Sequence, residues 1–205
     1  MRRKWSVRDW VFIGLFGALW GAAEITLGSV LHLAFPPLAD TFLVGLIMAV
    51  IGCLIALCGR LFVAHRGSLL LIGAVTAILK AFSLGGVKLG PIIAIMAESA
   101  LMELGLLLVA GDSPFAFALA GLLALSWNFF HRFLMMGLLY GSGFVEVGLK
   151  MARAGARLLR LREELVVGIL ALLLAIRLAA GAAAGLLARS LGLQIRRRLM
   201  RDANP

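Results

Sequence analysis

Long apolar runs fill most of this chain, and short polar or glycine-containing segments separate them. A helix needs about 20 mainly apolar residues to cross the hydrocarbon core of a bilayer. Six segments meet or approach this length: 11–33, 39–58, 68–86, 90–110, 114–140 and 165–188. The pattern predicts an all-α polytopic membrane helix bundle of about six transmembrane helices. Because only short tails and connections remain, we expect residues 1–205 to form a single integral membrane domain.

The positions of Lys and Arg predict the orientation of these spans, because cytoplasmic segments are enriched in both. Both ends of the chain are basic: they contain Arg2, Arg3, Lys4, Arg8, Arg189, Arg196, Arg197, Arg198 and Arg201. We therefore predict that both termini are cytoplasmic, which requires an even number of spans. The connection with Arg60 and Arg66 fits the cytoplasmic side, whereas residues 35–40 lack Lys and Arg and fit the outside.

Residues 144–164 do not fit this scheme. Arg153, Arg157 and Arg160 share one helical face through their i, i+4, i+7 spacing, and Leu149 and Leu159 belong to the apolar side. This pattern predicts an amphipathic helix on the membrane surface. Six spans place the segment outside, although such arginines are normally cytoplasmic. Either this segment breaks the rule, or the number of spans between 114 and 165 differs from the prediction.

Composition supports the membrane assignment over nucleic-acid binding. The chain is 62% hydrophobic, its mean hydropathy is +1.05 and its net charge is +10. The basic residues lie at segment ends, where lipid headgroups are found, and no aromatic and basic platform for nucleic acid occurs. Cys53 and Cys58 are separated by i, i+5, about 140° around a helix, so they form neither a disulfide within it nor a shared metal site. We expect no metal site and no cofactor.

Polar residues inside the apolar segments are the main indication of function. They are Glu24, Lys80, Glu98, Glu103, Arg132 and Arg177, together with Asn128 and His131. One charged side chain near the bilayer centre costs at least about 2.5–3.5 kcal/mol on insertion scales. Apart from Glu103, the set extends from the midplane towards the outer face. So many groups at similar depth predict a polar cavity that binds or moves something polar.

The predicted substrate-binding residues are aromatic, amide or ionisable. They are Trp20, Glu24, Lys80, Glu98, Trp127, Asn128, His131 and Arg177. The aromatic rings and the imidazole would stack on or hydrogen-bond a planar ligand, and the two carboxylates would accept from amino or cationic groups. Asn128 would donate and accept, and Arg177 would hold a carboxylate or phosphate. The structural alternative is that these residues pair with one another, as Glu98 with Arg177 or Glu24 with Lys80.

Small residues form ridges on the first segment. Gly14, Ala18 and Ala22 lie on one ridge, and Gly17 and Gly21 on another. Such spacing lets helices approach closely, either within this protein or at a partner subunit. The last segment contains a similar pair, Gly181 and Gly185.

Taken together, these features resemble the substrate-binding S components of energy-coupling factor (ECF) vitamin transporters, over nearly the whole chain. The resemblance implies a multi-pass protein of a prokaryotic cell membrane that binds a water-soluble vitamin or precursor. It also implies that Gly14, Ala18 and Ala22 face a transmembrane coupling subunit. The N-terminal histidine motif of the metal-type members is absent, which disfavours a metal substrate.

The predicted function is therefore substrate binding in an ECF-type importer, with a small polar, heterocyclic micronutrient as substrate. The chain lacks a Gly-x-x-x-x-Gly-Lys-Ser/Thr motif, so ATP hydrolysis would belong to partner ATPase subunits. One alternative is a ligand-free scaffold or assembly subunit. Another is an intramembrane enzyme that uses Glu98 and His131 as acid and base. No Ser-His, HExxH or paired-aspartate motif supports the enzyme.

Overall fold

A computed structural model describes residues 4–34, 42–83, 89–109, 111–140, 146, 153 and 166–202. Within these residues the chain forms six helices of 14 to 37 residues and no strand. They are α1 (Val7–Ala34), α3 (Phe42–Arg60), α4 (Ser68–Ala81), α5 (Leu89–Leu108), α6 (Pro114–Tyr140) and α8 (Val166–Asp202). Five of them are long and apolar enough to cross a membrane. The predicted all-α membrane helix bundle is confirmed.

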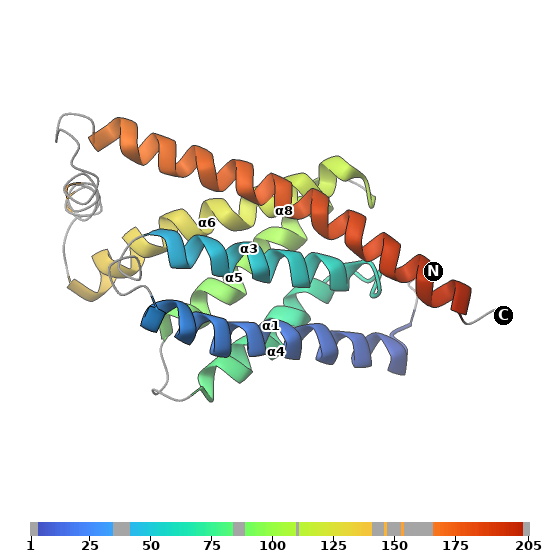
Figure 1. Ribbon diagram of the computed structural model, residues 1–205. Helices are drawn as coiled ribbons and strands as arrows, with labels where there is room; N and C mark the ends of the chain where they lie inside the picture. Colours follow the sequence, from blue (N-terminus) through green and yellow to red (C-terminus); the bar gives the residue numbers. More distant parts are fainter. Residues whose placement is uncertain are drawn as a thin grey trace.

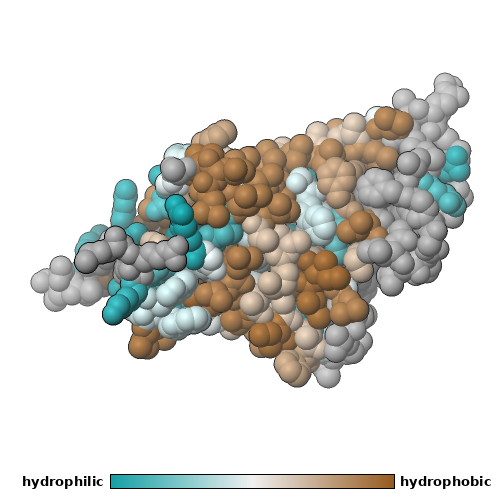
Figure 2. Space-filling view, turned by 180° about the vertical axis from the view of Figure 1, so that it is seen from behind, coloured by the Kyte–Doolittle hydropathy of each residue, from teal (hydrophilic) through white to brown (hydrophobic). Residues whose placement is uncertain are grey.

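Consecutive helices run in opposite directions, so the two ends of the chain lie at the same end of the bundle (Figure 1). We call this the basic end, because it contains Arg8, Arg60, Arg66, Arg189 and Arg196. Hydrophilic side chains gather at this end, and a broad hydrophobic surface covers the middle of the molecule (Figure 2). With six helices that alternate in direction, both ends of the chain lie on one side of the bundle, as the two basic termini predict.

Two helices differ in length from the predicted spans. The helix α4 ends at Ala81 rather than near residue 86 and has 14 residues, or about 21 Å. It is therefore shorter than the hydrocarbon core, which is about 30 Å thick. The helix α8 continues past residue 188 to Asp202 and has 37 residues, or about 55 Å. Its C-terminal part projects beyond the other helices at the basic end (Figure 1).

The predicted amphipathic helix at 144–164 lies outside the described residues, apart from Glu146 and Arg153. The helix α6, before this segment, ends on the side of the bundle away from the basic end, and α8, after it, begins on that same side (Figure 1).

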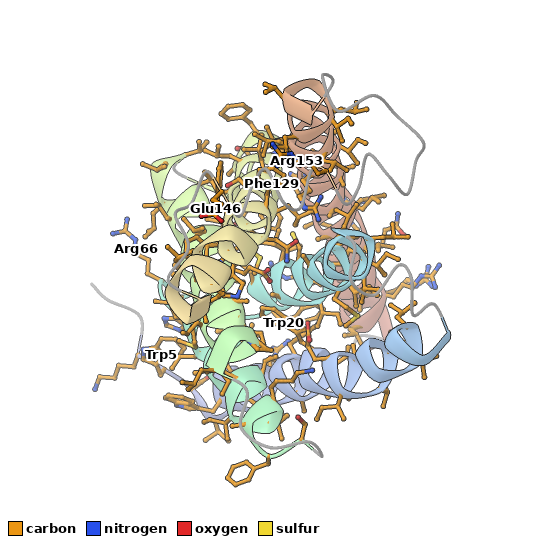
Figure 3. All side chains as sticks on the ribbon, turned by 90° about the vertical axis from the view of Figure 1, so that its left-hand side faces the viewer. Trp5, Trp20, Arg66, Phe129, Glu146 and Arg153 are labelled. Atoms are coloured by element: carbon orange, nitrogen blue, oxygen red, sulfur yellow. The ribbon has the colours of Figure 1, made fainter. Side chains whose placement is uncertain are left out.

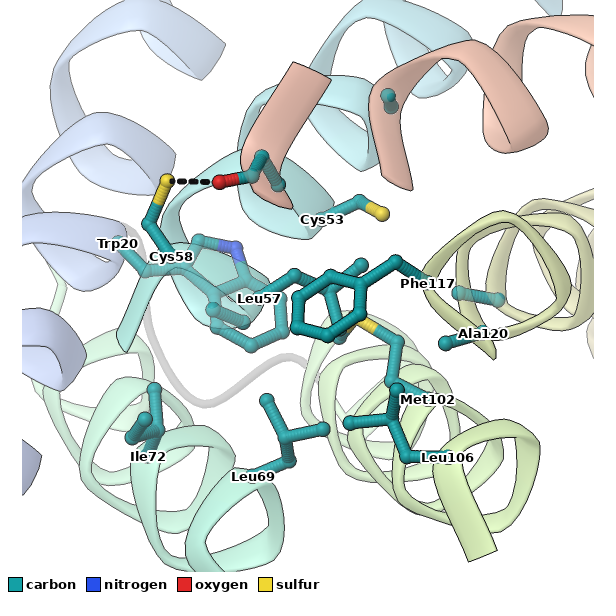
Figure 4. Close-up of a cluster of buried hydrophobic side chains, with 14 of the residues drawn as sticks. Trp20, Cys53, Leu57, Cys58, Leu69, Ile72, Met102, Leu106, Phe117 and Ala120 are labelled. Atoms are coloured by element: carbon teal, nitrogen blue, oxygen red, sulfur yellow. Dashed lines mark hydrogen bonds between the residues drawn. The ribbon is translucent and has the colours of Figure 1, made fainter. Parts of the chain in front are cut away.

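The core is built around α3, which packs against α1, α4, α5, α6 and α8. Its residues Cys53, Ala56 and Leu57 are almost fully buried. Large apolar side chains from the surrounding helices fill the remaining space (Figure 4). The Sγ of Cys58 donates a hydrogen bond of 3.2 Å to the carbonyl oxygen of Ala188, which links α3 to α8. Both cysteines are free.

The orientation can be tested with cysteines introduced into two connections. We expect Asp40→Cys, between α1 and α3, to react with a membrane-impermeant maleimide from outside intact cells. We expect Arg66→Cys, between α3 and α4, to stay unlabelled, because positive charge holds that connection in the cytoplasm. The native chain is the control, since its two cysteines are buried. The opposite labelling pattern would show that the bundle is inverted.

Candidate functional site

An ion pair joins α1 to α4 in the half of the bundle away from the basic end. Lys80 Nζ lies 3.5 Å from Glu24 Oε2 and donates a 2.9 Å hydrogen bond to the Glu24 carbonyl oxygen. Lys80 lies in the last turn of α4, and Glu24 lies just past the centre of α1. The two helices pack together so that these positions are neighbours. This is one of the two structural pairs that the sequence left open.

A second buried carboxylate lies between α5 and α6. Glu98 is 5% exposed, and its Oε1 accepts a 3.2 Å hydrogen bond from Asn128 Nδ2. No ion pair between Glu98 and Arg177 occurs in the described part of the chain. Instead, Glu98 lies close enough to Glu24 for their charges to interact. We call Trp20, Glu24, Lys80, Glu98 and Asn128 the central polar cluster.

Glycines of α3 make room for two members of this cluster. A Cβ atom added at Gly52 would lie 2.6 Å from Trp20 Cε2, and one added at Gly45 would lie 3.6 Å from Asn128 Oδ1. Trp20 is fully buried and lies between the helices when the bundle is viewed along its axis, whereas Arg66 lies at the periphery (Figure 3). The helix α3, which carries no charge between Thr41 and Gly59, therefore forms the wall behind the cluster.

The Trp20 indole faces the Glu24 carboxyl group without reaching a good hydrogen-bond geometry. Its Nε1 atom is sealed from solvent and has no hydrogen-bond partner among the described residues. Buried polar atoms in folded proteins are almost always paired. This donor is therefore available to a group that enters the cluster.

Trp127 and His131 form a second group on α6, one turn apart. Their ring centroids lie 5.6 Å apart at an interplanar angle of 44°. The Nε1 of Trp127 and the Nδ1 of His131 are buried without a hydrogen-bond partner in the part of the chain that the structure describes. The adjacent Asn128 connects this pair along α6 to the central polar cluster.

Arg177 does not join the central polar cluster. It is 2% exposed, and its guanidinium Cζ lies 5.7 Å from the ring centroid of Phe129, a cation–π arrangement. Of the eight predicted substrate-binding residues, the structure thus brings five together, places two beside them on α6 and places Arg177 on Phe129.

Glu103, which lies deeper than the other polar residues, has a different task. Its Oε1 accepts a 2.7 Å hydrogen bond from the Gly67 N–H, and its Oε2 accepts one of 3.1 Å from the Leu69 N–H. The start of α4 has no side-chain cap of its own, so Glu103 caps it from α5. Helix N-termini leave several N–H groups unpaired and favour negative charge.

A group at the basic end was not predicted from the sequence. Ser6 and Asp9 form a reciprocal cap at the start of α1. Asp9 Oδ2 also lies 3.3 Å from His65 Nε2, and the Trp5 ring stacks on His65 at 4.3 Å. The Ser-x-x-Asp spacing before an apolar run was the available signal for the cap. This group fixes the N-terminal segment to the connection between α3 and α4.

The two small-residue ridges of α1 have different surroundings. Added Cβ atoms at Gly17 and Gly21 would lie 2.6 Å and 2.8 Å from Val75 and Leu79 of α4. The other ridge faces outward: nothing lies within 4 Å of a Cβ added at Gly14, and Ala18 and Ala22 are exposed. The first ridge is internal packing, and the second remains uncovered.

Two further features lie apart from these sites. A cavity of about 130 Å³ at the basic end is lined in part by Arg60, Arg66, Glu103 and Asp112; it contains none of the predicted substrate-binding residues. Among the described residues, no group of three or more His, Cys, Asp or Glu side chains could hold a metal ion.

Comparisons of the chain with models of protein families, with curated proteins and with solved structures find no match.

Proposed function

We propose that this chain is the membrane-embedded substrate-binding subunit of an ECF-type importer in a prokaryotic cell membrane. Its substrate would be a small polar micronutrient, a heterocyclic vitamin or precursor. The observation that carries this proposal is the central polar cluster, in which side chains from α1, α4, α5 and α6 meet inside the hydrophobic belt. Charged groups at such a depth are costly and typically mark binding or transport pathways.

Unpaired polar atoms favour a ligand over simple packing. The indole donors Trp20 Nε1 and Trp127 Nε1 and the imidazole nitrogen His131 Nδ1 are buried without partners within the described residues. Leaving a buried polar group unpaired costs about 1–3 kcal/mol. A cluster that served only to hold helices together would gain nothing from these three groups, whereas a bound heterocycle would satisfy them and stack on the aromatic rings.

The uncovered ridge Gly14, Ala18 and Ala22 supports a partner subunit. It runs from the half of α1 nearer the basic end to just past the centre of the helix, so a helix docked there would leave the opposite end of the bundle uncovered. Under this proposal the partner is the transmembrane coupling subunit, and its ATPase subunits supply the energy. Exposed Leu15 and Leu19 flank the ridge and would contribute apolar contacts to lipid or partner.

Glu98→Gln should separate a binding role from a packing role. Gln keeps an acceptor for Asn128 but removes the charge, and a hydrogen bond to a charged group contributes about 1.5–3 kcal/mol. We expect substrate affinity to fall by about tenfold or more, while the melting temperature in detergent changes little. Loss of folding, in a protein from which no ligand is ever recovered, would instead support the scaffold alternative.

Ala18→Leu tests the partner. Added bulk on the uncovered ridge should prevent close helix approach, so the variant should bind substrate normally but lose its coupling subunit on co-purification and fail to support uptake. Ala183→Leu, at an exposed position of α8, is the matched control and should behave as the native chain. If Ala18→Leu retains its partner and uptake, the ridge faces lipid.

A further inference from the structure

The central polar cluster contains two carboxyl groups, Glu24 and Glu98, and one cation, Lys80. If both carboxyl groups were ionised, the cluster would carry one negative charge in excess. Lys80 is already engaged by Glu24 through both its carboxylate and its carbonyl oxygen. The amide of Asn128 is the only hydrogen-bond partner of Glu98 within the described residues, and it is neutral.

Among the described residues, no Lys, Arg or His side chain forms an ion pair with Glu98. Arg177, the nearest candidate by depth, lies over the Phe129 ring and forms no ion pair with Glu98 in the described part of the chain. The charge that Glu98 does interact with is the like charge of Glu24. A buried carboxylate without a cationic partner is strongly unfavourable and takes up a proton instead. A positive charge placed beside Glu98 would replace that proton and compensate the carboxylate.

We infer that the central polar cluster takes a cationic substrate: a small heterocycle that carries a fixed positive charge or a protonated amine, set against Glu98. This inference rests on the proposed function and names its substrate class. A carboxylate or phosphate substrate would instead bring a third negative charge to Glu24 and Glu98, and like charges in close contact are repulsive.

Trp20 adds a second requirement. Its side chain is fully buried, its indole faces Glu24, and its Nε1 donor is unpaired among the described residues. A hydrogen-bond acceptor on the substrate would pair with this donor. The Trp20 indole packs against Gly52 of α3, which holds the ring in place, and a planar ring could stack on it where a flexible amine could not.

The test uses compounds that differ in charge. One set shares a single ring: 1-methylnicotinamide is a cation, nicotinamide is neutral and nicotinate is an anion. A second set contains thiamine as a cation, riboflavin as a neutral compound and biotin as an anion. Binding of each compound to the detergent-purified protein is measured by equilibrium dialysis at pH 7, and bound small molecules are identified by mass spectrometry after denaturation.

Within each set, we expect the cation to bind at least tenfold more tightly than the neutral compound and the anion. We expect Glu98→Gln to remove most of this preference. Asp112→Asn is the control, because it removes one negative charge at the basic end, away from the cluster, and should leave the preference unchanged. If none of the six compounds binds, the compound released on denaturation is the test: a cation would support the cationic substrate class, and a neutral or anionic compound would overturn it.

The possible failures are distinguishable. A neutral or anionic compound that binds as tightly as the cation would overturn the cationic substrate class and leave the binding subunit intact. A folded protein that binds none of the six compounds and releases no small molecule would overturn both proposals. The comparison among compounds uses the native chain, so it holds even if Glu98→Gln does not fold.

Discussion

Gly185→Ala should be among the most destabilising single changes in this protein. A Cβ atom at Gly185 would overlap the backbone carbonyl group of Phe117 on α6, and the same contact surface includes Gly181 and Gly121, which approach each other equally closely. Backbone atoms cannot turn aside as a flexible side chain can, so α6 and α8 would have to separate. Overpacking of this kind costs about 1–3 kcal/mol. The measurement is the thermal unfolding midpoint of the purified protein in detergent.

Gly168→Ala provides the matched control in the same helix. Nothing lies within 4 Å of a Cβ added at Gly168, and Ala is the better helix former by about 1 kcal/mol. This variant should be as stable as the native chain or slightly more stable. Equal unfolding midpoints for the Gly185 and Gly168 variants would contradict the close contact between α6 and α8.

Glu103→Ala should destabilise the bundle by about 2–6 kcal/mol, because it leaves the Gly67 and Leu69 N–H groups without partners, at about 1–3 kcal/mol each. Glu103 is 4% exposed, so water would not replace the lost bonds efficiently. The negative charge beside the N-terminus of α4 would also be lost. Chemical denaturation followed by circular dichroism measures the change in the free energy of unfolding.

The conservative variant Glu103→Gln separates the cap from the volume of the side chain. Gln fills the same space and keeps one acceptor, so its loss of stability should be about half of that of the Ala variant. If Glu103→Ala were as stable as the native chain, Glu103 would not be the cap of α4.

The number and type of helices could be predicted from the sequence because the physical signal is local. A run of apolar residues long enough to cross a bilayer has few other uses, and the basic termini independently required an even number of passes. The lengths of the helices were less predictable. The helix α8 continues to Asp202, well past residue 188, where the predicted span ended, because the apolar run alone does not determine where a helix stops.

The partners of the buried charges could not be predicted, because they depend on how each helix is rotated and how far it extends. Depth in the membrane, judged from position along each span, allowed two ion pairs equally well: Glu24 with Lys80, and Glu98 with Arg177. The structure forms the first pair and places Arg177 on Phe129 instead. Lys80 meets Glu24 because α4 is short and brings its last turn to that depth.

The role of Glu103 was equally hidden, because the backbone groups that it caps lie more than thirty residues earlier in the chain. The two ridges of α1 show the same limit. Gly17 with Gly21 and Gly14 with Ala18 have the same spacing, and only the position of α4 decides which ridge is packed and which is uncovered. Contacts between distant segments leave no periodic signal in either one.

The central claim, that this chain binds a small polar molecule inside the membrane, has one direct test. The protein is purified in detergent from cells grown in rich medium, the native fold is checked by its unfolding transition, and the small molecules released on denaturation are quantified by mass spectrometry. We predict close to one heterocyclic molecule per chain, and much less from Glu98→Gln purified in parallel. A native chain that is folded, purified without dilution of its ligands and free of any released small molecule would contradict the claim.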